Sequence, residues 1–160
     1  MDMTGEITLE APRETVWAAL NDAAVLKGAI PGCEALEKVS DTEFTATVVT
    51  KVGPIKARFS GRVALTDILA PVSYTISGEG QGGIAGFAKG GAEVALDAVD
   101  TNRTMLRYVV RAQVGGKIAQ LGARLIDSTA KKLAGQFFDR FAEIIAAGSP
   151  QSVTAEAGTQ

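Results

Sequence analysis

The side chains that most often carry out chemistry in proteins are nearly absent from this chain. It has no histidine and a single cysteine, Cys33, among 160 residues. Without histidine there is no Ser-His-Asp or Cys-His nucleophile pair, no imidazole zinc site and no ordinary neutral-pH general base. Catalysis would have to rely on carboxylates, lysine, tyrosine or a bound cofactor. The remaining oxygen ligands suit hard cations rather than zinc or iron–sulfur clusters, so we expect no metal and no redox cofactor.

Two other features could do chemistry, and both have a simpler interpretation. Glu93 and Asp97 lie on the polar face of a predicted strand, which indicates a surface position rather than a catalytic pair. The segment 78–91, GEGQGGIAGFAKGG, holds seven glycines. No Gly-Lys-Ser/Thr triplet and no helical pattern follows it directly, which argues against a phosphate-binding loop. Glycines between strands instead let a sheet bend and twist, and a bent antiparallel sheet can wrap around a ligand.

Composition predicts one globular domain inside the cell. Hydrophobic residues make up 46% and charged residues 21%, and the net charge of −2 gives no general attraction to nucleic acid. The N-terminus, MDMTGEITLE, has no apolar signal core, and no run of apolar residues is long enough to span a membrane. We expect a single domain over residues 1–147, a disordered tail over 148–160, and a cytoplasmic location.

Hydrophobic periodicity predicts one strand, two short helices, six further strands and one long helix. The bounds that the pattern gives most clearly are Gly5–Glu10, Pro12–Asn21, Ala23–Ala29, Cys33–Ser40 and, for the long helix, Lys117–Ala147. Because the connections between strands are short, the sheet should be antiparallel. The fold class is therefore α+β, with a seven-stranded curved antiparallel sheet wrapped around the C-terminal helix, the arrangement known as the helix-grip fold.

Small residues occupy many positions that should face the long helix: Ala46, Gly61, Gly78, Gly80, Ala92, Ala98, Ala112 and Gly122. They would leave space for an elongated apolar ligand, or would let the helix lie closer to the sheet. We expect a cavity of about 300 Å³ or more. Its entrance should lie near the glycine-rich segment, because the bulk of Phe137, Phe138 and Phe141 would close the other end.

The expected cavity residues are mostly large side chains on the apolar faces, together with one glycine: Phe44, Phe59, Val63, Tyr74, Ile76, Phe87, Leu106, Tyr108, Leu121, Gly122 and Leu125. For each of them taken singly, ordinary core packing is the alternative. Three cations, Lys89, Lys117 and Arg124, would contact a polar ligand group or anionic headgroups, and a solvated surface is the alternative for these.

Four stretches carry a resemblance to a known family: Ile30–Glu34, Val52–Lys56, Gly80–Gly90 and Val114–Ile126. The last is the most specific, because it places a Gly-Gly turn, a lysine and Gln-Leu-Gly-Ala-Arg at fixed spacing. The chain resembles the CoxG family of carbon monoxide dehydrogenase subunits, within the START-like (SRPBCC) superfamily of helix-grip proteins. The resemblance runs over about residues 3–147.

The resemblance implies a non-catalytic accessory subunit of an aerobic molybdenum hydroxylase of the carbon monoxide dehydrogenase type. Such a protein would bind a hydrophobic small molecule or lipid, with an isoprenoid quinone as cargo. It would assist peripheral association with the inner face of the cell membrane, or deliver the electron acceptor. A homodimer is one possible oligomeric state. Two alternatives remain: a cyclase or hydrolase of the same fold that uses a cavity tyrosine or carboxylate, and a protein–protein adaptor with a filled core.

Overall fold

The computed structural model describes residues 1–148, so most of the tail for which disorder is expected lies outside the described residues. One antiparallel sheet has the strand order β1-β7-β6-β5-β4-β3-β2. Its strands are β1 (Asp2–Leu9), β2 (Cys33–Ser40), β3 (Glu43–Val52), β4 (Ile55–Leu69), β5 (Ser73–Gln81), β6 (Phe87–Asp100) and β7 (Arg103–Gly115). The helices are α1 (Arg13–Leu20), α2 (Ala23–Ala29) and α3 (Ala123–Gly148), with 3₁₀ turns η1 (Gly83–Ala85) and η2 (Lys117–Leu121).

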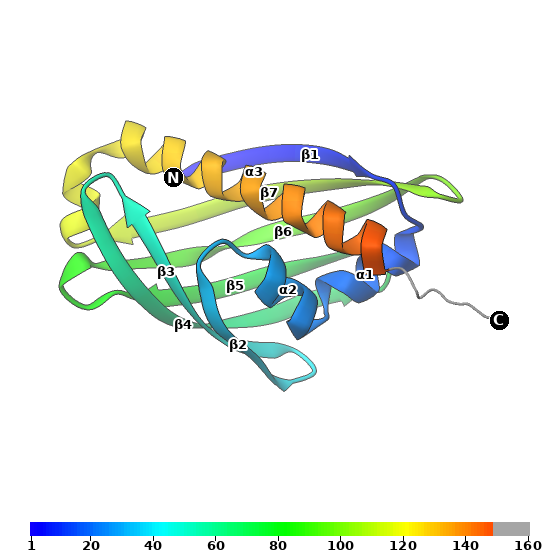
Figure 1. Ribbon diagram of the computed structural model, residues 1–160, viewed down its shortest axis with the longest axis horizontal. Helices are drawn as coiled ribbons and strands as arrows, with labels where there is room; N and C mark the ends of the chain where they lie inside the picture. The colour runs from blue at the N-terminus through cyan, green and yellow to red at the C-terminus, as the bar shows by residue number, and fades with distance from the viewer. Residues whose placement is uncertain (149–160) are drawn as a thin grey trace.

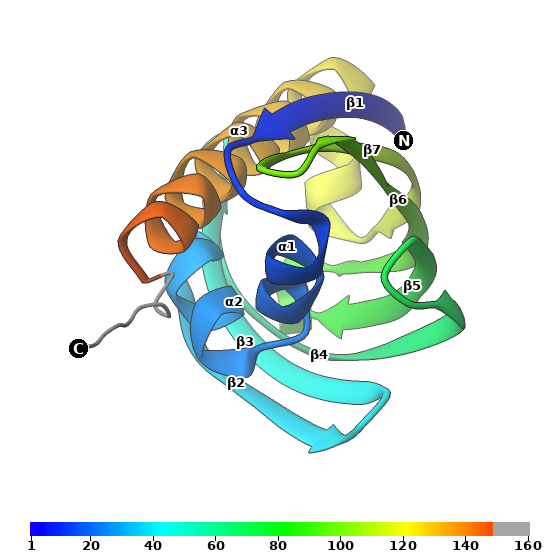
Figure 2. The ribbon, with the colours of Figure 1, turned by 90° about the vertical axis from the view of Figure 1, so that its right-hand side faces the viewer.

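The sheet curls around α3, and α1 and α2 fill the space between the first and second strands of the chain (Figures 1 and 2). The predicted helix-grip arrangement is confirmed. Strand alternation explains it. In β4, Ala57, Val63 and Leu65 face inward, while Lys56 and Arg58, on either side of Ala57, are exposed. Burying one apolar face of each strand against the helices is what stabilises the domain.

Local signals fix the two short helices. The side chain of Asp22 accepts hydrogen bonds from the backbone N–H groups of Ala24 and Val25, which caps the start of α2. Pro31 and Gly32 end it, and Gly32 has a left-handed backbone with φ of 75°. The chain then returns to the sheet, where the Val49 N–H donates to the Gly32 carbonyl. These contacts hold α2 against the open edge of the sheet.

The core is densest where α1 and the C-terminal half of α3 meet the sheet. Its completely or almost completely buried side chains include Val16, Leu96, Leu106 and Phe141. A second, smaller cluster lies at the opposite end of the sheet, where Ala57, Ala85 and Ile118 are buried together. Core packing is therefore present near both ends of α3, and the space between the two clusters is where a ligand could fit.

Two differences from the sequence-based prediction concern the glycines. Most of the segment 78–91 lies within β5 and β6, and only residues 82–86 form the turn between them. The long helix begins at Ala123, not at Lys117, so that boundary was wrong. Gly122 has φ of 96°, a left-handed conformation that an α-helix cannot pass through, and residues 117–121 before it form a 3₁₀ turn.

Candidate ligand cavity

A cavity of about 330 Å³ lies between the concave face of the sheet, α2 and α3. We call it the inner cavity. Its lining is supplied by every strand and every α-helix of the domain: Met3, Leu20, Leu26, Ile30, Leu36, Phe44, Ala46, Val63, Leu65, Tyr74, Ile76, Ala92, Val94, Leu106, Tyr108, Val110, Ala134, Phe137 and Phe138. None of these side chains is charged, so the cavity offers an almost purely apolar surface.

A second hollow of about 350 Å³ continues from the inner cavity along the concave face, and we call it the glycine channel. The two share Ala46, Val63, Ile76, Ala92 and Val110. The channel extends over β3–β7 toward the glycine-rich end of the sheet, where its wall is formed largely by small residues: Ala46, Gly61, Gly78, Gly80, Ala88, Gly90, Gly91, Ala92 and Ala112. The lack of large side chains at these positions creates the hollow.

The backbone needs glycine at some of these positions for a second reason. Gly78 pairs directly with Gly90 across β5 and β6, and Gly61 pairs with Gly80 across β4 and β5. A Cβ atom on Gly90 would collide with the carbonyl oxygen of Arg111, and one on Gly61 would collide with that of Glu79. The strands therefore approach one another more closely than side chains would permit, which accompanies the bend of the sheet.

Two tyrosines, Tyr74 and Tyr108, are the residues with polar side chains in the wall of the inner cavity. Tyr74 is only 5% exposed and meets Trp17 edge to face, with ring centroids 5.2 Å apart. Tyr108 stacks on Phe138 at 5.3 Å. Burial raises the pKa of the Tyr74 hydroxyl well above its usual value, so this group stays protonated. A neutral hydroxyl in an apolar cavity can donate a hydrogen bond to a ligand.

The structure brings most of the predicted cavity residues together. Phe44, Val63, Tyr74, Ile76, Leu106 and Tyr108 line the inner cavity, and Phe59 lines the glycine channel with Val63 and Ile76. Four others lie elsewhere. By its register in β6, Phe87 shares the convex face of the sheet with Lys89, and Gly122 is exposed between η2 and α3. Leu121 and Leu125 pack over the β3–β4 turn at Gly53.

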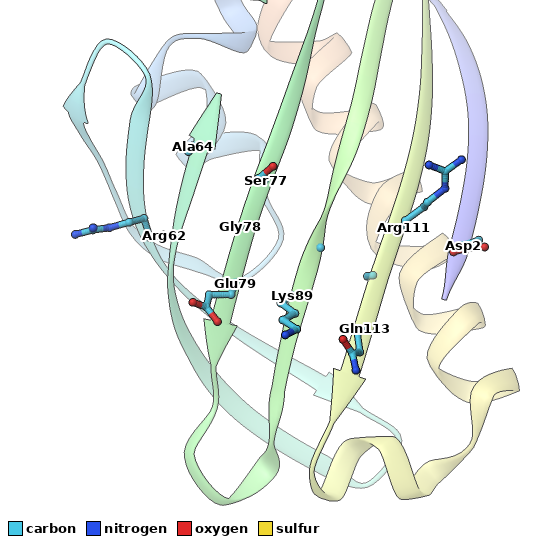
Figure 3. Close-up of a pocket in the computed structure, with 11 residues that line it drawn as sticks. Asp2, Arg62, Ala64, Ser77, Gly78, Glu79, Lys89, Arg111 and Gln113 are labelled. Carbon is cyan, nitrogen blue, oxygen red and sulfur yellow. The ribbon is translucent and has the colours of Figure 1, made fainter. Parts of the chain in front are cut away.

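The three predicted cations also lie outside the inner cavity. Lys117 is exposed on η2 and Arg124 on the first turn of α3. Lys89 is exposed on the convex face, where it borders an outer groove of about 710 Å³ with Arg62, Glu79 and other polar residues (Figure 3). Glu79 lies directly between Arg62 and Lys89 in the strand register, so opposite charges alternate across this groove and largely offset one another.

Sequence reasoning missed the contribution of the helices to the cavity wall. Leu20 of α1 and Leu26 of α2 line it, as does Ile30 directly after α2. Phe137 and Phe138, expected to close one end by packing together, also form part of the wall, and only Phe141 is completely buried. The helical spacing of these aromatics was visible in the sequence. What could not be read from it was which helix face meets empty space rather than a packed neighbour.

One end of the molecule combines positive charge with an exposed apolar side chain. Ile84, at the tip of η1, is 89% exposed. The neighbouring connections, residues 51–56, 82–86 and 115–124, contain four cations and no acidic residue: Lys51, Lys56, Lys117 and Arg124. These connections come together at the left of Figure 1 and are joined by the cluster around Ala85 and Ile118. We call this surface the basic end.

Comparison with protein families matches residues 5–146 of this chain, which include the whole cavity wall except Met3, to the CoxG family of carbon monoxide dehydrogenase subunits. The chain belongs to the CoxG family. This CoxG-family protein has no helix, among residues 1–148, that is long and apolar enough to cross a membrane. No curated protein matches it by sequence.

Several solved structures share the fold of this chain. A conserved protein from Geobacillus kaustophilus is 31% identical, with a TM-score of 0.86 over 92% of this chain and 96% of that one. A START superfamily protein from Mycobacterium smegmatis is 14% identical, with a TM-score of 0.64 over 95% of this chain and 99% of that one. The Zhui aromatase/cyclase from Streptomyces sp. R1128 is also 14% identical, with a TM-score of 0.65 over 92% and 98%. The last two show a shared fold alone.

Proposed function

We propose that this CoxG-family protein is a non-catalytic accessory subunit that carries an apolar ligand, an isoprenoid quinone or a similar lipid, for a molybdenum hydroxylase of the carbon monoxide dehydrogenase type. The observation that supports this proposal is the uncharged inner cavity continued by the glycine channel. Family membership supports the accessory role and the choice of partner enzyme.

The energetics of such a carrier follow from burial of apolar surface. A chain that buries about 400 Å² of apolar area gains on the order of 10 kcal/mol. Loss of ligand freedom and ordering of side chains cost several kcal/mol of that gain. A remainder of about 6 kcal/mol corresponds to a dissociation constant of tens of micromolar, which is weak enough to release the ligand to a partner.

We further propose that the protein collects or delivers its cargo while docked peripherally on an anionic membrane surface through the basic end. Cations near a membrane surface attract anionic headgroups, and an exposed aliphatic side chain can insert between them. Ile84, rather than Phe87, is the residue that this structure presents for insertion, because Phe87 is half-buried on the convex face.

The proposed function is tested by native mass spectrometry of the purified protein together with organic extraction. We expect a bound lipid, and we expect the emptied protein to take up a naphthoquinone or benzoquinone with an isoprenoid chain from vesicles. The quinone-loaded protein should accelerate electron transfer from the molybdenum enzyme more than the same amount of empty protein does. Failure of the emptied, folded protein to bind any chain-bearing quinone would contradict the carrier function.

An enzyme of the same fold is the second candidate. The observation that favours it is the pair of tyrosines in the cavity wall, together with a fold shared with an aromatase/cyclase. A cyclase also needs groups that move protons, and the inner cavity has no carboxylate, lysine or histidine in its wall. Turnover of a polyketide-type substrate that is lost in Tyr74→Phe would support this candidate over a carrier.

A further inference from the structure

The inner cavity restricts the charge of whatever it holds. Its wall contains hydrocarbon side chains, one methionine and two tyrosines, and it contains no lysine, arginine or histidine. Moving a carboxylate or phosphate from water into such a site without a cationic partner costs far more than the burial of a lipid chain returns. A fatty acid or a phospholipid headgroup therefore does not suit the inner cavity, and an uncharged group does.

The cavity also holds hydrogen-bond donors that are not used within the protein. Tyr74 and Tyr108 form no hydrogen bond through their hydroxyls within residues 1–148. Among the described residues, the one fully occluded side-chain nitrogen or oxygen without a partner is Arg13 Nε, so neither hydroxyl is sealed inside apolar packing. Tyr74 lines the cavity and is 5% exposed, so its unpartnered hydroxyl keeps a small accessible surface.

From these observations we infer that the inner cavity binds the polar head of an uncharged carbonyl compound, with Tyr74 donating a hydrogen bond to the carbonyl oxygen, and that the apolar chain of the same molecule lies in the glycine channel. The inference rests on the proposed carrier function and adds the residue that binds the polar head and the orientation of the ligand. A carbonyl accepts this hydrogen bond and has no donor of its own. An alcohol would bring an O–H donor that needs a further partner. The raised pKa of Tyr74 keeps the donor neutral.

The orientation follows from the distribution of polar groups along the continuous space. Both tyrosines line the inner cavity, and neither lines the glycine channel. The inward-facing positions of the channel carry Phe59 and Val48 among alanines and glycines, which give an apolar chain contacts and give a carbonyl no donor side chain. The charged residues Arg62, Glu79 and Lys89 also border the channel, from strand positions that alternate with these and face the convex side. Residues that line both spaces, such as Ile76 and Ala92, surround the passage from the inner cavity, which holds the polar head, to the channel, which holds the chain.

The hydrogen bond is tested with Tyr74→Phe, which removes one oxygen and leaves the ring against Trp17. We expect roughly tenfold weaker binding of a naphthoquinone with an isoprenoid chain, the value of one hydrogen bond. Binding of an isoprenoid hydrocarbon of the same chain length should not change. If both ligands lose affinity equally, or if neither does, the inferred hydrogen bond is wrong while the carrier function stands. If the parent protein binds neither ligand, the proposed function itself fails.

The charge restriction has its own comparison. A fatty acid with a chain of matching length should bind the parent protein at neutral pH at least tenfold more weakly than the naphthoquinone. Tighter binding of the fatty acid would overturn the restriction to uncharged ligands.

The orientation is tested with Gly80→Leu, which fills the glycine channel. A Cβ atom at Gly80 would meet only Phe59 Cβ at 3.7 Å and the Ser60 carbonyl oxygen at 4.0 Å, so the strand accepts the substitution without a collision. We expect quinones with long chains to lose affinity about tenfold or more, and the same ring with a methyl group in place of the chain to bind as before. Equal losses for both compounds would place the ring in the channel and overturn the orientation. Thermal unfolding at the parent temperature checks that the variant is folded.

Discussion

At the scale of single residues, the shape of the cavity depends on where side chains are missing. Gly5 of β1 lies directly opposite Tyr108 of β7 in the strand register. A Cβ atom at Gly5 would collide with the hydroxyl end of the Tyr108 ring. Because that ring is stacked on Phe138 of α3, it cannot move aside without disturbing the helix. Gly5 thus holds Tyr108 in the position where it forms part of the cavity wall.

Gly5→Val should therefore destabilise the fold. We expect a loss of about 1–3 kcal/mol in the free energy of unfolding, the range for forcing extra volume into packed structure. Urea denaturation measures it. The same substitution in a Tyr108→Ala background should cost much less, because the colliding ring is gone. An equal cost in both backgrounds would show that strand geometry, not the tyrosine, excludes a side chain at this position.

At the scale of secondary-structure elements, the sequence predicted the type and order of every strand and α-helix. Strict alternation in residues 55–65 and 104–114 is a strong signal, because each strand buries one face only. The signal was weaker at glycines, because glycine has no side chain to mark an apolar or a polar face. The pattern therefore did not reveal how far strands β5 and β6 extend into the glycine-rich segment. The start of α3 was misplaced because residues 117–121 share the spacing of a helix without its backbone.

The cavity was predictable only in part, for a physical reason. Small inward residues such as Gly78 and Ala112 indicated missing volume, and the channel lies where they are. Whether the helices fill that volume depends on their distance from the sheet, which no local pattern encodes. The roles of Leu26, Ile30 and Phe138 in the wall could not be derived, because each also fits ordinary core packing.

Two glycines, one just before α3 and one inside it, should respond in opposite ways to the same substitution. Gly122 has φ of 96°, so Gly122→Ala forces a side chain into a left-handed conformation and should destabilise the protein by about 1 kcal/mol. Gly135 lies inside α3 with nothing within 4 Å of its Cβ position. Gly135→Ala should stabilise by about 0.5–1 kcal/mol, because alanine is the better helix former. Thermal unfolding of the pair measures both, and shifts of the same sign would contradict the assignment of α3.

At the scale of the whole molecule, the antiparallel order separates the charges. Successive hairpin connections alternate between the two ends of the sheet, so the β3–β4, β5–β6 and β7–α3 connections share the basic end. The β2–β3, β4–β5 and β6–β7 turns share the other end, which carries acidic residues including Asp41, Asp67 and Asp100. A net charge near neutrality thus hides a charge asymmetry that would orient the protein at an anionic surface.

This asymmetry predicts that binding to vesicles with anionic lipid depends on the basic end alone. Ile84→Ser removes the exposed aliphatic side chain and should weaken binding roughly tenfold. Lys117→Gln removes one cation and should weaken it about fivefold, with a loss that shrinks as salt screens the attraction. Vesicle co-sedimentation at low and high salt measures both effects.

Val99→Ser is the matched control, because Val99 is also exposed, at 50%, but adjoins the acidic β6–β7 turn. Since that end is repelled by an anionic surface, Val99→Ser should bind as the parent does, and a loss comparable to that of Ile84→Ser would mean that the protein docks without the orientation proposed for it.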